Sequence, residues 1–376
     1  MFVIAIMKNK AFFHIIQVAI GQRCQLDNSL KEEEWAWVME MATKHAIMGL
    51  VADAIEKLPE NQRPPTPLRL ECASQTVKTE KCNIHTFRDC VAITKIFEKR
   101  GFKCCILKGQ GNALSYNNPL RRQSGDIDLW LNGGREKVIG FVKSQKNSIE
   151  ARIHHVEYSE KGISTSVELH YVPMFLYSFI SQYRFEKFCK KEMERQMCHL
   201  VDIDKSLLGT DKDGDYRFAV PTPDFNAVFQ MVHIMRHLFE EGIGLRQLID
   251  YYHVLRLLPK EDHEKVMRVL RELGLKRFAA SMMYVLEKVC DINEELMICP
   301  KDNHCGELLL YEIMMAGNFG IEDNRLGEWR HKSIFHMFIW KLNNNMKYWK
   351  LCPSEVAWGP AFRIWHFCWR KCKGYV

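Results

Sequence analysis

Residues 107–131 read LKGQGNALSYNNPLRRQSGDIDLWL, and this stretch decides the fold that we expect. A glycine turn at Gly109 is followed by Asp126 and Asp128, which alternate with apolar residues. Side chains alternate between the two faces of a strand, so both aspartates should share one face and the apolar residues the other. Neighbouring carboxylates repel each other unless a cation lies between them. The pattern therefore predicts a strand that helps to bind Mg²⁺ and a phosphate.

A later segment supplies a third carboxylate. In residues 165–172, TSVELHYV, Glu168 lies between a valine and a leucine and should also face away from the core. Nucleotidyl transfer uses two divalent cations, one to activate the attacking hydroxyl and one to neutralise the triphosphate and the departing pyrophosphate. We expect Asp126, Asp128 and Glu168 to be the catalytic metal ligands, with two Mg²⁺ ions or with Mn²⁺ in their place.

The turn before the aspartates has the residues of a nucleotide-phosphate site. Backbone N–H groups at Gly109, Gln110 and Gly111 can approach phosphate oxygens closely, and the following helix N-terminus favours negative charge. Lys108 and Arg122 place cations near the same edge of the sheet, as phosphate or pyrophosphate clamps. Taken singly, an Asp-x-Asp is usually a solvated strand end and a Lys-Gly pair a turn. Their order along the chain, before a carboxylate strand, favours a nucleotide site.

Composition restricts the class of protein. With 376 residues, 47% hydrophobic and 26% charged, the chain has the composition of a soluble globular protein of two or three domains. A net charge of +7 suits anionic ligands such as nucleotides but does not by itself indicate nucleic-acid binding. We find no apolar run long enough for a membrane span and no signal peptide. The 14 scattered cysteines then predict reduced thiols and a cytoplasmic protein.

The spacing of apolar residues divides the chain into three regions. Helical spacing predicts an N-terminal helical region over residues 1–100, with proline breaks near residue 65. Residues 101–220 change period and predict a small mixed α/β core, with strands at 104–108, 126–131, 152–158 and 165–172. Residues 221–376 predict a C-terminal helical domain, with helices at 222–241, 243–258, 261–274 and 276–290. The expected fold class is α+β.

Histidines supply weaker signals. His170 either orients the neighbouring glutamate or contacts substrate, or it is a half-buried strand histidine with a satisfied partner. His233 and His237 lie one helical turn apart, a spacing that can bind zinc, but no third ligand accompanies them in a known zinc pattern. We expect them to line the cleft opposite the α/β core together with Arg246. Asp250 is expected to pair with Arg246, four residues earlier on the same helix.

Three further segments resemble known motifs. Residues 211–215, DKDGD, lack the glutamate of a calcium loop and are interpreted as a hairpin turn. The segments 329–351 and 362–376 mix aromatic and basic residues at helical spacing. Such helices can contact an anionic membrane surface or an acidic carrier. The interpretation that we favour is a pair of amphipathic helices packed on the domain with a basic outer face.

These motifs together resemble a known family. A Lys-Gly turn precedes an arginine that lies four residues before an Asp-x-Asp, as Arg122 lies before Asp126, and a later strand carries Glu168 two places before His170. Downstream, HIMRH (233–237) and GLRQLIDYYHVL (244–255) look like the family's histidine-bearing helix and its "LR-x-L-x-D" helix. The chain resembles the bacterial uncharacterised nucleotidyltransferase family, within the DNA polymerase β-like superfamily.

The resemblance implies metal-dependent transfer of a nucleoside monophosphate from an NTP to an unidentified acceptor, with release of pyrophosphate. One departure is that Gly109–Gln110 replaces the usual glycine-serine pair, so a hydroxyl that would contact the triphosphate is missing. Two alternatives stay open. One is transfer of another phosphorylated group to a glycan, and the other is a non-catalytic nucleotide-binding or partner-binding protein of the same fold.

Overall fold

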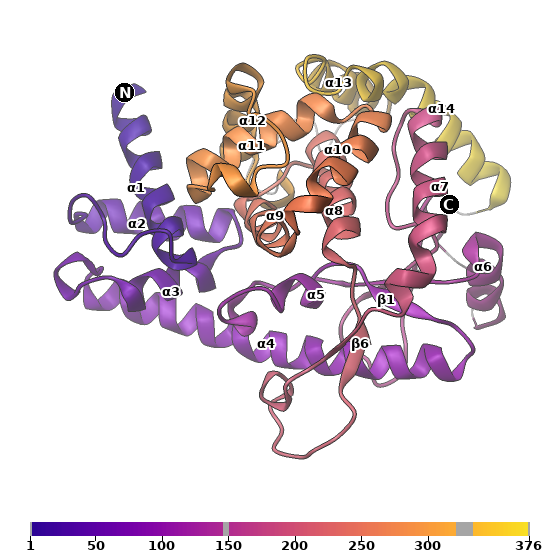
Figure 1. Cartoon of the computed structure of the whole chain (residues 1–376), viewed down its shortest axis with the longest axis horizontal. Helices are drawn as coiled ribbons and strands as arrows, with labels where there is room; N and C mark the ends of the chain where they lie inside the picture. The colour runs from indigo at the N-terminus through magenta and orange to yellow at the C-terminus, as the bar shows by residue number, and fades with distance from the viewer. Residues whose placement is uncertain (1, 146–149, 321–333, 375–376) are drawn as a thin grey trace.

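The computed structural model describes residues 2–145, 150–320 and 334–374. The N-terminal part is helical. Its longest helix begins at a proline-rich segment, and Pro67 lies in the first turn, where a proline costs no helical hydrogen bond. That helix, α4, runs across the lower part of the view in Figure 1, with the first three helices packed at one end. The bounds are α1 Phe2–Ile20, α2 Glu32–Lys44, α3 Met48–Lys57 and α4 Thr66–Lys99.

A mixed sheet follows α4. Among the described residues its strands have the order β1-β2-β4-β3. The outer strands β1 and β3 run antiparallel to their neighbours, whereas β2 and β4 in the centre are parallel. A parallel pair needs a crossover connection, and helix α6 lies in it. The bounds are β1 Cys104–Ile106, α5 Gln110–Ala113, β2 Ile127–Leu131, α6 Gly134–Gln145, β3 His155–Tyr158 and β4 Val167–His170.

The two faces of this sheet have different surroundings. Ile127, Leu129 and Leu131 of β2 pack with Phe97 of α4 and Val138 of α6 in one hydrophobic cluster. On the opposite face, Trp130 of β2 stacks on Phe225 of α8, with ring centroids 5.5 Å apart. The apolar alternation along β2 therefore places both aspartates on the face that looks toward the C-terminal helices, as the sequence predicted.

Helices form most of the remaining chain. In Figure 1, α8 to α12 lie above the sheet, and α13 and α14 continue over the upper right of the view. The bounds are α7 Phe179–Met197, α8 Pro223–Glu240, α9 Leu245–Leu257, α10 His263–Glu272, α11 Lys276–Cys290, α12 Asn303–Ala316, α13 Ile334–Met346 and α14 Pro353–Lys373.

The α+β fold class is confirmed, with a small mixed sheet flanked by helices at both ends of the chain. The division into regions at residues 100 and 220 stays a prediction. Within the predicted N-terminal helical region, residues 45–47 separate α2 from α3, and Ala46 adopts a left-handed φ of 57°. Residues 211–215 lie in the long connection between antiparallel strands β5 (Leu200–Asp202) and β6 (Arg217–Ala219), rather than in a tight turn.

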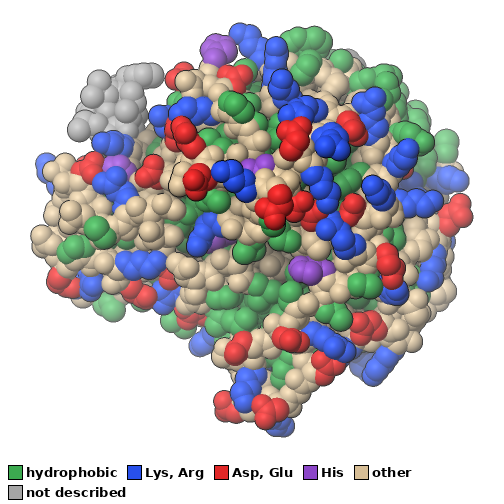
Figure 2. Space-filling view, viewed as in Figure 1, with side chains coloured by type: hydrophobic (Ala, Val, Ile, Leu, Met, Phe, Trp, Pro, Cys, Tyr) green, Lys and Arg blue, Asp and Glu red, His purple; other side chains and the backbone are tan. Residues whose placement is uncertain are grey.

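On the face shown in Figure 2, basic and acidic side chains are interspersed over the upper half, with a hydrophobic band below them. That face offers no long basic stripe of the kind that tracks a nucleic-acid backbone.

Candidate active site

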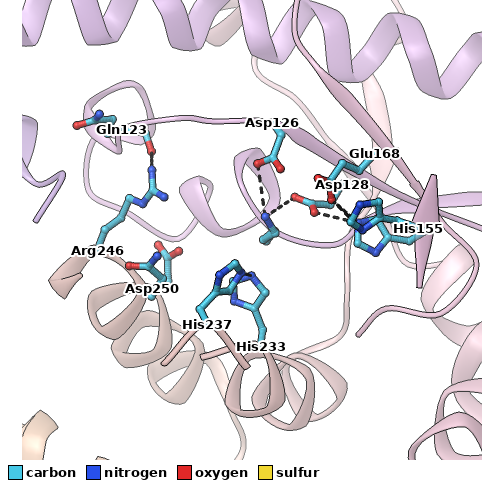
Figure 3. Close-up of polar contacts among 12 residues, drawn as sticks. Gln123, Asp126, Asp128, His155, Glu168, His233, His237, Arg246 and Asp250 are labelled. Atoms are coloured by element: carbon cyan, nitrogen blue, oxygen red, sulfur yellow. Dashed lines mark hydrogen bonds and ion pairs between the residues drawn. The ribbon is translucent and has the colours of Figure 1, made fainter. Parts of the chain in front are cut away.

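The register of the two parallel strands brings the predicted carboxylates together. Asp128 of β2 pairs with Glu168 of β4, and Asp126 immediately precedes β2. His170 lies two residues after Glu168 on the same face of β4, and His155 of β3 is its antiparallel partner. The geometry therefore gathers carboxylates and imidazoles from three strands on one face of the sheet (Figure 3).

Lys108 lies among these carboxylates. Its Nζ is 2.7 Å from Oδ2 of Asp128 and 3.5 Å from Oδ1 of Asp126. The chain can turn here because Gly109 adopts a left-handed φ of 61°, which a side chain would strain. Burial alone would lower the pKa of the Lys108 ammonium, but the charges of Asp126, Asp128 and Glu168 raise it well above its usual range. The carboxylate group thus already holds one cation, which shows that it favours positive charge.

His170 links two of the carboxylates. Its Nε2 lies 3.0 Å from Oδ1 of Asp128 and 3.3 Å from Oε2 of Glu168. Burial would lower the pKa of His170, but hydrogen bonds to both carboxylates raise it to about 9. The same imidazole lowers the pKa of Glu168 far below its ordinary value, against the effect of burial. His170 therefore contacts both acids, an arrangement that fits a histidine orienting the glutamate and also a strand histidine with a satisfied partner.

The aspartates differ in their electrostatic environment. Lys108 is the main cause of a lowered pKa at Asp126, whose side chain is about one third exposed. Burial, followed by the charge of Asp126, raises the pKa of Asp128. Among the described residues, the metal-compatible cluster at this point comprises Asp128, Glu168 and His170, with one ligand atom of each within 4.8 Å of the others. Asp126 lies beside this cluster, on the other side of the Lys108 ammonium.

The site opens into a large cleft of about 1330 Å³ between the sheet and the C-terminal helices. Its acidic side carries Asp126, Asp128 and Glu168, and Lys108 also lines it. Basic side chains also line the cleft, from the segment before β3 and from α8, α13 and α14: Arg152, Arg236, Lys341, Arg363 and Arg370. The cleft therefore combines a carboxylate end, suited to cations, with basic groups suited to phosphates.

Buried ion pairs hold the basic wall in place. Arg236 of α8 donates to Oε2 of Glu355 on α14 at 3.0 Å, and both side chains are almost fully buried. Glu355 also accepts backbone hydrogen bonds from Tyr177 and Ser178, which lie at the start of α7. Glu240 of α8 pairs with Lys341 of α13 at 2.7 Å and with Arg363 of α14 at 3.2 Å. Both C-terminal helices thus contact α8. Their basic residues Lys341 and Arg363 line the cleft, so the predicted basic outer face is wrong at these positions. Residues 329–333 and 375–376 of the predicted segments lie outside the described residues.

Two predicted residues, Arg122 and Arg246, lie in other surroundings. Arg122 is buried and donates to both carboxylate oxygens of Asp250, at 2.7 and 2.6 Å. Asp250 was expected to pair with Arg246, but its observed ion pair comes from the α/β core, a partner that spacing within one helix cannot reveal. Arg246 donates to the Gln123 carbonyl at 3.0 Å (Figure 3). Among the described residues, neither arginine lines the cleft.

The glycine turn packs against other elements of the fold. Gln110 is buried, and its Nε2 donates to Oδ1 of Asn83 on α4 at 2.7 Å. A Cβ at Gly111 would lie 3.1 Å from the Ile106 carbonyl and 3.2 Å from a methyl of Val220, so close packing accounts for this glycine. Among the described residues, this turn is not part of the cleft wall.

His233 and His237 of α8 both line the cleft, as expected. Their Nε2 atoms face each other at 3.0 Å. Figure 3 shows them on α8, across the cleft from the carboxylates.

The sequence interpretation missed several residues of the cleft. It did not single out His154 and His155, although they form a visible pair at the start of a strand. It also missed Arg236, which lies inside the HIMRH segment, and assigned Lys341 and Arg363 to a surface face. These positions depend on how α13 and α14 pack, which local spacing does not specify.

Comparison with models of protein families identifies the family of this chain. A family model described as "Uncharacterised nucleotidyltransferase" matches residues 31–291, more than half of the chain. The chain belongs to the uncharacterised nucleotidyltransferase family. The matched residues of this family member include all the carboxylates of the site, whereas Lys341, Arg363 and Arg370 lie beyond them. The family indicated by the sequence motifs is therefore confirmed.

A solved structure similar to this family member is that of an antigenic nucleotidyltransferase-like protein from Paracoccidioides brasiliensis. The match has a TM-score of 0.33 and 13% identity, and covers 59% of this chain and 95% of that chain. No curated protein matches the family member. Every helix within its described residues is too short or too polar to cross a membrane.

Proposed function

We propose that the protein is a metal-dependent nucleotidyltransferase, which moves a nucleoside monophosphate from an NTP to an acceptor hydroxyl and releases pyrophosphate. The observation that carries this proposal is the cleft itself. Asp126, Asp128 and Glu168 converge at its acidic end, and buried or half-buried basic residues line it from α8, α13 and α14. A triphosphate bridged to divalent cations needs both kinds of group within one pocket.

The residues present fit divalent cations. Carboxylate oxygens are the ligands that Mg²⁺ and Mn²⁺ prefer, and Asp128 and Glu168 offer them from paired positions on rigid strands. The Lys108 ammonium now compensates these charges at 2.7 Å from Asp128. We propose Asp126, Asp128 and Glu168 as the ligands of two ions. Bound there, the ions would activate the acceptor hydroxyl and neutralise the triphosphate and the leaving pyrophosphate.

The chain's own residues would do the rest by binding and positioning. His170 holds the carboxylates of Asp128 and Glu168 in fixed orientations. Lys108, once cations neutralise its acidic neighbours, is placed to contact a phosphate oxygen. Arg236 and Arg363 would bind the outer phosphates from the opposite wall, where the NTP enters between sheet and helices. The DNA polymerase β-like superfamily, a cytoplasmic location and a bacterial origin remain part of this proposal.

The test compares isosteric amides. With Mg²⁺, each NTP and a metabolite pool that supplies acceptors, Asp128→Asn should abolish pyrophosphate release while the far-ultraviolet circular dichroism stays that of the wild type. Asp211→Asn, the same change on the exposed connection between β5 and β6, is the matched control and should leave release unchanged. Undiminished release by Asp128→Asn would remove these carboxylates from the reaction.

One observation favours a second candidate, a nucleotide-binding or partner-binding protein without catalysis. Gln110, which stands where the family's serine is expected, turns its side chain toward Asn83 of α4. Calorimetry that detects Mg²⁺-dependent NTP binding, with no pyrophosphate release from any acceptor pool, would support this candidate. A phosphorylated product on a glycan without pyrophosphate release would instead indicate transfer of another phosphorylated group.

The acceptor is not specified by these residues. On α14, the aromatic side chains Trp358, Trp365 and Phe367 are partly exposed, so contact with an anionic membrane surface or an acidic carrier is kept as a proposal. Binding of the protein to vesicles with and without anionic lipid would test that contact.

A further inference from the structure

A histidine cluster lies beside the carboxylates, in the wall of the same cleft. His154, His155 and His170 each offer a ring nitrogen, and these nitrogens lie within 4.8 Å of one another. The three residues are 8%, 9% and 3% exposed. His155 and His170 are direct cross-strand partners on β3 and β4, and His154 immediately precedes β3. The sheet register therefore fixes the cluster.

The polar atoms of this cluster are incompletely satisfied. His154 Nε2 faces His155 Nδ1 at 3.0 Å, an arrangement in which one ring must donate and the other accept. The Nδ1 atoms of His154 and His170 are buried and have no hydrogen-bond partner among the described residues. Buried polar nitrogens without a partner cost free energy and are uncommon in folded proteins. A cation bound between the rings would remove this cost.

We propose that His154, His155 and His170 bind a Zn²⁺ ion. Imidazole nitrogens suit zinc far better than they suit Mg²⁺, which prefers oxygen ligands. Three protein ligands leave the fourth position of a tetrahedral zinc site open, and this position would face the cleft. The site would then be a second metal centre, distinct in ligand chemistry from the proposed magnesium site.

The surroundings of His170 support this assignment. A histidine that ligates zinc usually donates its other ring N–H to a carboxylate, which fixes the orientation of the ring. His170 Nε2 lies 3.0 Å from Asp128 and 3.3 Å from Glu168, whereas its Nδ1 has no hydrogen-bond partner among the described residues, so one ring nitrogen stays available to a metal ion. His170 would therefore lie between the zinc ion and the proposed magnesium ligands.

The experiment uses the full-length protein and Zn²⁺ alone, titrated in competition with a chromophoric chelator. Wild-type protein should bind one equivalent, and His154→Ala should weaken the affinity by at least about 100-fold. His155→Gln provides a second variant that keeps a polar side chain of similar size. His85→Ala changes an exposed histidine of α4 and is the matched control, which should bind zinc as the wild type does. Unchanged affinity in both cleft variants would overturn the proposal.

X-ray absorption of the zinc-loaded protein identifies the ligand atoms. Nitrogen or oxygen ligands alone are expected. A sulfur ligand would instead show that the ion binds to exposed cysteines, and it would overturn the proposal. The exposed cysteines among the described residues are Cys24, Cys82, Cys198, Cys368 and Cys372.

Failure here can be told apart from failure of the proposed function. The two proposals are measured separately on the wild type, as Zn²⁺ binding without NTP and as Mg²⁺-dependent NTP binding after zinc has been removed with a chelator. Zinc binding without NTP binding supports the histidine centre and counts against the proposed function. NTP binding without any zinc binding by the wild type would overturn the zinc centre and leave the proposed nucleotidyltransferase standing.

Discussion

The ion pair between Arg122 and Asp250 should contribute strongly to stability, because it joins the sheet region to helix α9 in a dry environment. The Arg122 side chain is 6% exposed and that of Asp250 is 3% exposed. Asp250 accepts two hydrogen bonds from the guanidinium, at 2.7 and 2.6 Å, and a third from the Tyr116 hydroxyl at 2.7 Å. Removing the carboxylate would leave a buried positive charge and a buried hydroxyl without partners.

The magnitude follows from these contacts. Breaking one side of a buried ion pair typically costs about 3–5 kcal/mol, and a buried hydroxyl left unsatisfied costs roughly 1–3 kcal/mol more. Since the two losses overlap at one carboxylate, we expect Asp250→Ala to lower the free energy of unfolding by about 4–6 kcal/mol. Asp250→Asn retains an acceptor oxygen and should cost about half as much. The double variant with Arg122→Met and Asp250→Leu should be more stable than Asp250→Ala, because no charge stays buried.

Urea unfolding followed by tryptophan fluorescence would measure these differences. The control is Asp213→Ala, since Asp213 pairs with Lys205 on the exposed connection before β6 and its side chain is 94% exposed. That variant should leave the unfolding midpoint unchanged. A loss below about 1 kcal/mol for Asp250→Ala, or a double variant less stable than Asp250→Ala, would refute the reasoning.

Two further predictions concern packing and pH. Gly49→Ala should destabilise the protein by about 2 kcal/mol or more, because the new Cβ would lie 2.2 Å from the Arg121 carbonyl oxygen. The control is Gly140→Ala on α6, where the new Cβ would meet open space. This variant should stabilise the protein by roughly 0.5–1 kcal/mol in the same urea assay. His253 is buried against Tyr116, and burial lowers its pKa to about 4 from 6.5. The folded state therefore binds fewer protons at His253 than the unfolded state does. The contribution of His253 to the free energy of unfolding is complete above about pH 6.5 and is lost as the pH falls toward 4. The free energy of unfolding from urea titrations should fall between pH 7 and pH 5 by about 2 kcal/mol more in the wild type than in His253→Phe, and equal losses would contradict the assignment.

The sequence predicted those parts of the fold that depend on local periodicity. Alternation along residues 126–131 and 165–172 identified both central strands and the shared face of Asp128 and Glu168. This succeeded because strand side chains alternate strictly, so polar and apolar positions can be assigned to faces without knowing the partner strand. The separation of α2 from α3 could not be predicted in this way, since both helices continue the same apolar spacing across Ala46.

The contacts of residues whose partners are distant in the sequence could not be predicted from local spacing. Arg122 has the spacing of a phosphate clamp, yet its partner is Asp250, 128 positions later in the chain. The basic side of the cleft depends on how α14 docks, and a helix with aromatic and basic residues can be docked in several orientations. Glu355 near its start decides the docking by pairing with Arg236, but its burial is a property of the packed structure that local spacing does not reveal.

Docking of α14 through Glu355 has a consequence for the order in which the protein becomes complete during synthesis. The strands that carry Asp128 and Glu168 emerge from the ribosome long before Glu355, which joins Arg236 only after residue 355 has left the tunnel. Until then the nascent chain exposes its acidic residues to water and presents an arginine that lacks its buried partner. This side of the cleft therefore forms only after α14 has been synthesised, and a nascent chain that stops before α14 would lack the cleft residues Arg363 and Arg370.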